Sequence, residues 1–264
     1  MNLLFEHGLS ISYDRVLDIS NTVGESVVDT FKRNNTVCPL NLKKGIFTTA
    51  AVYNIDHNPT AASAKSPFHG TSISLFQHTP SQGTPQETLV MKKEKVKKIS
   101  PLPVHYTNVK PASFIKQPPP VEQKIPDLPL CIQPFLHNQL EWLNKVCLTE
   151  EYNDSLKLTW SSHHALLANE QFEIGISSLL PLLRDQSHDV ATIKHSLDKI
   201  KDATSFLNPT QSPVVTADQP LFALTNQIQW TWPIEYENFV FLLGGLHIEM
   251  ASLKMIGRVL KNSG

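Results

Sequence analysis

Three acidic residues stand where predicted secondary-structure elements end or begin. Asp56 closes a predicted strand over 46–55, Asp218 follows a second predicted strand, and Glu249 lies in the first turn of the helix after a third. Carboxylates that converge from separate strands repel one another, and hard divalent cations with oxygen ligands hold them together. Two such ions can activate water and stabilise the leaving oxygen in phosphoryl transfer. The pattern therefore predicts Asp56, Asp218 and Glu249 as catalytic, metal-binding residues for Mg²⁺ or Mn²⁺.

Two histidines, His57 and His247, lie beside these acids in the sequence and are predicted to support the site. Each acid also has a purely structural interpretation. Asp56 can start an Asx turn with the Asn-Pro pair at 58–59. Asp218 can cap the following helix, and Glu249 is favourable near a helix N-terminus. Spacing alone leaves both interpretations open.

The elements that must position these residues follow from hydrophobic periodicity and turn signals. The predicted elements are helix 12–34, strands 46–55 and 73–76, helices 135–146, 158–167, 173–183 and 187–206, strand 213–217, helix 221–229, strand 239–243 and helix 247–260. Strands that alternate with helices favour an α/β fold with a partly parallel sheet covered by helices. Such folds place their chemistry at the carboxyl ends of the parallel strands.

Composition divides the chain into three parts. Residues 1–78 are expected to form the N-terminal helix and first strands of the core, and 135–264 a helical region with the remaining strand–helix units. Between them, 79–134 is basic and then proline-rich, which predicts a linker or surface insertion without helix or strand over 100–134. The basic run at 92–98 fits a solvated tether, a phosphate contact or a nuclear-import signal.

The bulk properties exclude several classes of protein. A net charge of −1 gives no global field that would attract nucleic acid. The longest apolar run, over 239–243, is far shorter than the ~20 residues of a spanning helix. The N-terminus has no basic region of a secretory signal, so we expect an intracellular protein, with the nucleus as one compartment. Three widely spaced cysteines without a Cys-x-x-Cys pair indicate reduced thiols.

The order of the acids, and the 31-residue interval between the last two, is similar to the ribonuclease-H-like core of transposases and integrases. Four stretches also resemble a family of multicopy, mobile-element-like proteins of cnidarian and fish genomes. These stretches are 10–17 (SISYDRVL), 54–59 (NIDHNP) with 68–71 (FHGT) and 73–78 (ISLFQH), 218–224 (DQPLFAL) with 227–233 (QIQWTWP), and 244–251 (GGLHIEMA).

The resemblance implies a ribonuclease-H-like mixed sheet and a transposase-derived or integrase-derived domain, degenerate or truncated, with metal-dependent phosphoryl-transfer ancestry and DNA as its partner. Family members carry aspartate where this chain has Tyr53, and they continue past Gly264 with a further acid-rich segment. Between the two first-strand positions, Asp56 is favoured as the surviving ligand because it lies at the strand's carboxyl end. The competing class is a non-enzymatic module that binds other proteins.

Overall fold

The computed structural model describes residues 5–57, 68–92, 94–114, 133–148, 162–163, 173–185 and 188–261. The chain divides into two compact units. One comprises residues 1–117 and 173–264, and the other residues 118–172. In the second unit the described structure is chiefly one helix, α4 (Gln133–Leu148). Every other element described below belongs to the first unit.

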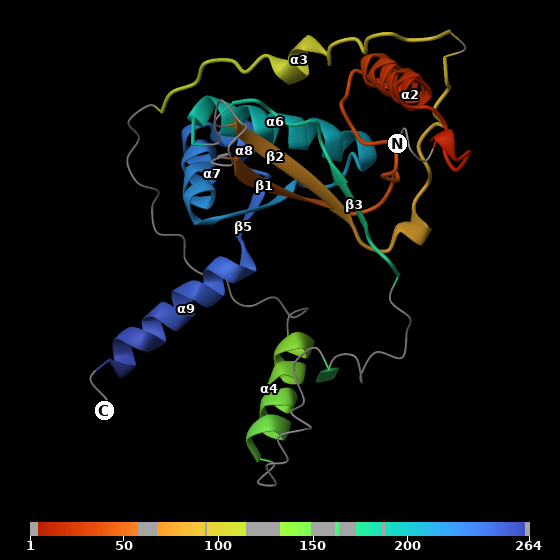
Figure 1. Cartoon of the computed structure of the whole chain (residues 1–264). Coiled ribbons are helices and arrows are strands. Elements are labelled where there is room, and N and C mark those ends of the chain that lie inside the picture. Colours follow the sequence, from red (N-terminus) through yellow and green to blue (C-terminus); the bar gives the residue numbers. More distant parts are fainter. Residues whose placement is uncertain are drawn as a thin grey trace. The chain divides into compact units, whose positions relative to one another are not determined.

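A five-stranded mixed sheet forms the centre of the first unit, in the order β3-β2-β1-β4-β5 (Figure 1). The strands are β1 (Thr48–His57), β2 (Phe68–Gln77), β3 (Ile176–Leu179), β4 (Val214–Ala217) and β5 (Val240–Leu243). The first three form an antiparallel meander, whereas β4 pairs in parallel with β1 and β5 in parallel with β4. The predicted α/β fold with a partly parallel sheet flanked by helices is confirmed at this level.

The parallel pairing of β1 with β4 has a fixed register, in which Thr49 lies opposite Val214 and Val52 opposite Ala217. A side chain extends the pairing at its start. The Gln211 amide accepts a hydrogen bond from the Thr48 N–H at 2.8 Å and donates one to the Thr48 carbonyl at 2.6 Å. Because both backbone groups of Thr48 are satisfied by one side chain, Gln211 adds a rung to the ladder and helps to set its register.

Helices cover one face of the sheet. α6 (Val190–Leu207) packs on β1 and β2, and α7 (Gln219–Thr231) packs on β4, β5 and α6. The sheet residues on this face are buried in one core with the α6 side chains; the cluster includes Ala50, Val52, Ile73, Leu75, Val215, Ala217, Ile193, Leu197 and Ile200. Burial of each large aliphatic side chain contributes about 1.5–3 kcal/mol, so this layer holds most of the hydrophobic stabilisation of the unit.

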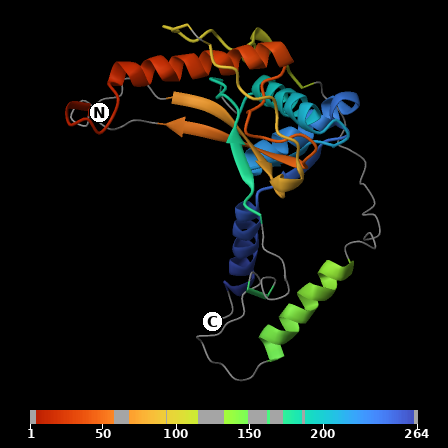
Figure 2. The ribbon, with the colours of Figure 1, turned by 90° about the vertical axis from the view of Figure 1, so that its right-hand side faces the viewer.

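The opposite face of the sheet is far more exposed. Leu179 is 61% exposed, Val240 and Leu242 are each 46% exposed, and Tyr53 is 37% exposed. The next helix, α9 (Gly245–Leu260), leads away from the sheet in both views of the ribbon and has no buried residue (Figure 1, Figure 2). Within the described part of the chain, apolar side chains therefore remain in contact with solvent on this face and along α9.

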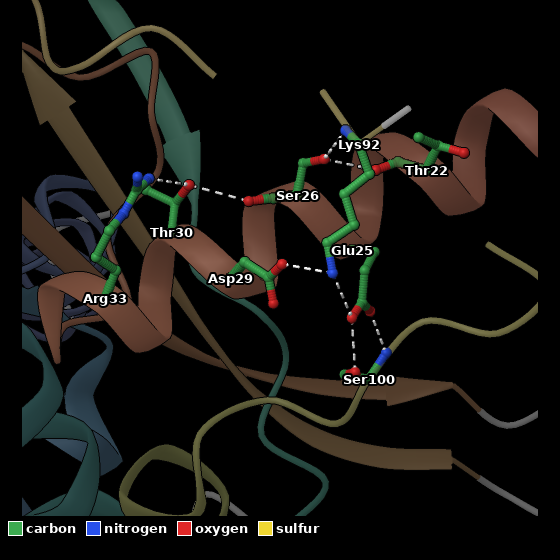
Figure 3. Close-up of polar contacts among 8 residues, drawn as sticks. All are labelled: Thr22, Glu25, Ser26, Asp29, Thr30, Arg33, Lys92 and Ser100. Atoms are coloured by element: carbon green, nitrogen blue, oxygen red, sulfur yellow. Dashed lines mark hydrogen bonds and ion pairs between the residues drawn. The ribbon is translucent and has the colours of Figure 1, made fainter. Parts of the chain in front are cut away.

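The first long helix, α2 (Tyr13–Asn34), confirms the predicted helix over 12–34 (Figure 2). It begins at Ser12, whose side chain accepts the Arg15 N–H at 3.3 Å. Residues 92 and 94–100, which we call the α2 strap, lie along it without regular structure. The strap is fastened at Glu25, a residue only 7% exposed (Figure 3). This carboxylate accepts hydrogen bonds from the backbone N–H and hydroxyl of Ser100 and from Lys92.

The predicted helix over 173–183 is wrong, because this segment supplies the edge strand β3. Its apolar residues fit both a helical and an extended spacing, so periodicity alone does not separate the two. Pairing with β2 decides the conformation, with Leu179 opposite Ser74 and Ile176 opposite Gln77. The predicted helices over 187–206, 221–229 and 247–260 are confirmed, whereas most of 158–167 and the Asn-Pro turn at 58–59 lie outside the described residues.

The prediction that 100–134 contains no helix is wrong for its first part. A short helix, α3 (Val104–Thr107), buries Tyr106 to 1% exposure, and the Tyr106 hydroxyl donates to the Pro181 carbonyl. The Tyr106 carbonyl also lies 2.7 Å from His195 Nε2 on α6. Proline restricts the backbone of this segment but does not prevent a buried aromatic residue from fixing it to the core. Residues 115–132 lie outside the described part.

Among the described helices, none combines the length and the hydropathy that a membrane crossing requires.

Loss of the Glu25 carboxylate is expected to weaken the fold in a pH-dependent manner. The Ser100 backbone N–H, the Ser100 hydroxyl and Lys92 lower the pKa of Glu25 from 4.5 to about 2. Because the folded-state pKa is the lower one, the contribution to stability is complete above about pH 4.5 and disappears as the pH falls toward 2. We expect Glu25→Gln to be less stable than wild type in urea unfolding at pH 7, and the difference to shrink below pH 4.

The matched control is Glu87→Gln, since the Glu87 side chain is 75% exposed and lies 4.0 Å from Arg33. This variant should follow the wild-type pH dependence. If wild type and Glu25→Gln differ in unfolding free energy by the same amount from pH 7 to pH 2.5, the assigned role of the Glu25 carboxylate is contradicted.

Removal of the Tyr106 ring tests whether 101–114 belongs to the core. We expect Tyr106→Ala to cost about 3–5 kcal/mol of unfolding free energy, as for other buried aromatic residues. Val104→Ala, in the same helix but 73% exposed, should change it by less than about 0.5 kcal/mol. Equal effects of the two substitutions in chemical denaturation would show that the segment is not packed.

Candidate active-site edge

The carboxyl ends of β1, β4 and β5 meet at one edge of the sheet. Val52 pairs with Ala217, and Ala217 with Leu243, so these three residues form the last level at which all three strands are paired. The next residues along the chain are Tyr53, Asp218 and Gly244. The Gly244 N–H donates to the Ala217 carbonyl at 2.9 Å, which holds the start of α9 against the end of β4.

Asp218 occupies the N-cap of α7. One of its carboxylate oxygens accepts the Leu221 N–H at 3.0 Å, and its carbonyl accepts the Phe222 N–H at 2.7 Å. The sequence pattern Asp-Gln-Pro favours this start, because the side chain satisfies a free N–H and proline suits the first turn. The structural interpretation of Asp218 is therefore confirmed, and half-burial at the sheet edge leaves its carboxylate accessible as well.

Tyr53 is the β1 residue at the level of Asp218, one step beyond the Val52–Ala217 pair. Strand alternation puts both positions on the exposed face of the sheet. The Tyr53 hydroxyl lies 3.1 Å from the Ser74 hydroxyl on β2, the strand on the side of β1 away from β4. The Tyr53 hydroxyl therefore contacts β2, on the side of β1 away from the strand that leads to Asp218.

Asp56 lies further along β1, opposite His69 of β2 and four residues beyond the last β1 residue paired with β4. Position 56 is three residues beyond position 53, which is a distance of about 10 Å along the strand at the usual rise of about 3.3 Å per residue. Alternation assigns position 56 to the face of Val52 rather than to that of Tyr53. The strands that carry Asp56 and Asp218 are neighbours, as predicted, but the register does not bring the two positions level.

Glu249 and His247 lie in the first turns of α9, which starts at the same sheet edge as Asp218. Glu249 is exposed and His247 half-buried. His57 is the last residue of β1 and lies beyond the part of that strand that pairs with β4. The edge therefore brings Asp218 and the start of α9 together, whereas positions 56 and 57 belong to the two-stranded β1–β2 extension.

Across the described residues, no three His, Cys, Asp or Glu side chains form a group that could hold a metal ion. The donors around Asp218 explain this result. Tyr53 offers a phenol whose hydroxyl contacts Ser74, and one Asp218 oxygen is engaged in the helix cap. A hard divalent cation needs several oxygen ligands, most of them anionic. The wild-type set at this level does not meet that need.

A cavity of about 750 Å³ lies elsewhere, between α6 and the segment 108–113. Lys194, Asp198 and Trp232 are among the residues that line it. Two of its charged residues have partners within the protein, since Lys194 contacts Glu235 at 2.8 Å and Asp198 accepts a hydrogen bond from Tyr236. None of the residues that line it belongs to β1, β4, β5 or α9, so this cavity is separate from the strand edge.

Comparisons with known proteins give one match. Residues 159–264 match the model of a family described as a domain of unknown function (DUF8702), a span that covers β3 to α9. No curated protein and no solved structure matches the chain.

Proposed function

We propose that this chain is a ribonuclease-H-like domain of transposase or integrase ancestry whose metal-dependent phosphoryl-transfer site has been lost at position 53. The ancestral substrate on this proposal is DNA. The domain itself keeps its fold but no longer binds the metal ions that phosphoryl transfer requires.

The strand order supports the fold part of the proposal. A ribonuclease-H-like sheet has an antiparallel β1–β3 meander followed by two parallel strands on the other side of β1, in the order 3-2-1-4-5. This chain has that order and those directions, with α6 and α7 as the connections to β4 and β5. In such a sheet the neighbouring carboxyl ends of β1 and β4 are where acids would converge.

The proposed loss of the metal site rests on one observation. Tyr53 and Asp218 lie at the same level of the sheet, at the carboxyl ends of neighbouring strands. Each position follows directly on the last β1–β4 pair, Val52 with Ala217, so the two share a level and lie on the exposed face of the sheet. The family that this chain resembles has aspartate at position 53. An aspartate there would stand beside Asp218, with Glu249 on the helix that starts at the same edge. Tyrosine removes one of the anionic ligands.

Titration of Mn²⁺ by calorimetry tests the proposal. We expect no heat of binding for wild type and for Asp56→Asn, and binding in Tyr53→Asp because that substitution returns a carboxylate to the level of Asp218. Tyr53→Asn is the matched control, since it makes the same change in size without the charge. Binding in Tyr53→Asp should disappear when Asp218→Asn is added.

Two other outcomes would overturn the proposal. Wild-type binding that is lost in Asp56→Asn would make Asp56 the ligand and the site intact. If no variant binds Mn²⁺, the proposed descent from a metal-dependent enzyme is contradicted. The alternative, a non-enzymatic module that binds other proteins, is then favoured. One observation favours that second function, namely the exposed apolar residues Val240 and Leu242 on the open sheet face, because such patches often mark sites of protein contact.

The cap at Asp218 sets what substitutions there do to stability. We expect Asp218→Ala to cost about 1 kcal/mol of unfolding free energy, because the Leu221 N–H loses its acceptor. Asp218→Asn keeps an acceptor oxygen and should remain within about 0.5 kcal/mol of wild type. Denaturant unfolding of the two variants measures both values. A large loss in Asp218→Asn would show that the charge itself, not the cap, holds the edge together.

A further inference from the structure

The α2 strap is held to α2 by a small number of polar contacts that converge on Glu25 (Figure 3). The Ser100 hydroxyl donates to one Glu25 oxygen at 2.8 Å, and the Ser100 N–H donates to the other at 2.5 Å. At the other end of the strap, Lys92 Nζ lies 3.3 Å from Glu25 and 2.6 Å from Asp29. The contacts of Glu25 and Asp29 with the strap are thus made by the ammonium group of Lys92 and by Ser100.

The strap also packs closely where it crosses the helix. A Cβ atom at Gly24 would lie 2.6 Å from Ile99 Cδ1, so the glycine makes room for the neighbour of Ser100. The remaining polar contacts are weaker or more exposed. Asn21 donates to the Lys97 carbonyl at 3.3 Å, and Lys95 pairs with Asp18 at 2.9 Å with its side chain 75% exposed. Exposed ion pairs contribute little to stability, so the two hydrogen bonds of Ser100 to the buried Glu25 carboxylate carry most of the attachment, and Lys92, 40% exposed, adds a smaller share.

Three features of Ser100 favour modification of its hydroxyl by a protein kinase. It lies in a segment without helix or strand, and it is half-buried rather than buried. Pro101 follows it, and a residue before proline is restricted to extended backbone. Local opening of the strap, whose described residues form no helix or strand, exposes the hydroxyl. An extended serine followed by proline is the acceptor of proline-directed serine/threonine kinases.

We infer that Ser100 is a phosphorylation site for a proline-directed kinase, and that the phosphate releases the α2 strap from α2. In this reaction the Ser100 oxygen attacks the γ-phosphorus of a nucleoside triphosphate. A new P–O bond forms, the bond to the β-phosphate oxygen breaks, and the nucleoside diphosphate leaves. The serine proton passes to the kinase, so Ser100 loses a hydrogen-bond donor and gains about two negative charges.

The charges around the phosphate determine the direction of the effect. The modified Ser100 would meet the Glu25 carboxylate, which its hydroxyl now contacts, and Asp29 lies one turn away on the same helix face. Lys92 is the one cation that contacts both carboxylates in the structure as described, so at this contact a single positive charge would meet about four negative charges. A phosphate placed beside acidic side chains disrupts a contact by repulsion. The strap therefore detaches instead of tightening.

The test uses the full chain, a recombinant proline-directed serine/threonine kinase, ATP and Mg²⁺, with mass spectrometry to map the sites. Ser212, which also precedes a proline and lies in an exposed loop, is the internal control. Limited trypsin digestion then reports the strap through cleavage within 92–98. Phosphorylation at Ser100 should raise this cleavage rate by about tenfold or more, because proteolysis follows the population of the open form.

Two sets of variants separate charge repulsion from the loss of a hydrogen bond. Ser100→Asp should raise cleavage within 92–98 well above Ser100→Ala, and the excess should fall to near zero in the Glu25→Gln background. Kinase treatment of Ser100→Ala should leave the rate of cleavage within 92–98 unchanged. Phosphorylation of Ser212 alone should also leave this rate unchanged. Modification of Ser212 without Ser100, or a phosphorylated Ser100 with unchanged cleavage, would overturn the inference.

Discussion

The parallel pairing of β1 with β4 is the constraint on which the rest of the sheet depends. It joins segments more than 160 positions apart and unites the β1–β3 meander with the strand–helix units at the end of the chain. Only four residue pairs form this ladder, and the Gln211 amide adds a fifth rung at Thr48. A shift of one residue would move each β4 side chain to the other face and expose Val215 and Ala217. The buried core under α6 and α7 therefore fixes which residues stand at the carboxyl edge.

Much of this fold could be predicted from local patterns, because amphipathic helices and buried β-branched runs carry their own signals. Helix α2 with its Ser12 cap, strands β4 and β5, and the Asp218 cap of α7 belong to this group. Strand β3 could not be predicted in the same way. It has four residues, lies at the sheet edge and exposes Leu179, so only its pairing with β2 distinguishes it from a helix. Long-range pairing overrides local preference in such segments.

The position of the site shows the same limit. The carboxyl end of a strand is visible in the sequence, but the level at which its neighbour ends is not. Strand β1 continues five residues beyond its pairing with the shorter β4, so Asp56 lies at the end of the strand but beyond the edge that the strands share. Tyr53, three positions before Asp56, is the residue at that edge. Strand ends coincide with a sheet edge only where neighbouring strands end together.

The replacement that we propose at position 53 has a physical logic of its own. Two carboxylates on adjacent parallel strands raise each other's free energy unless a cation lies between them. A chain released from selection for metal chemistry retains that cost without its function, and a neutral residue at either position relieves it. Tyr53 removes the repulsion and adds a contact with Ser74, while Asp218 is retained because α7 needs its cap. The two acids of such a pair are therefore not equally free to change. On this proposal, the acid that also caps a helix persists because α7 needs it, and the one on the open sheet face is the one replaced.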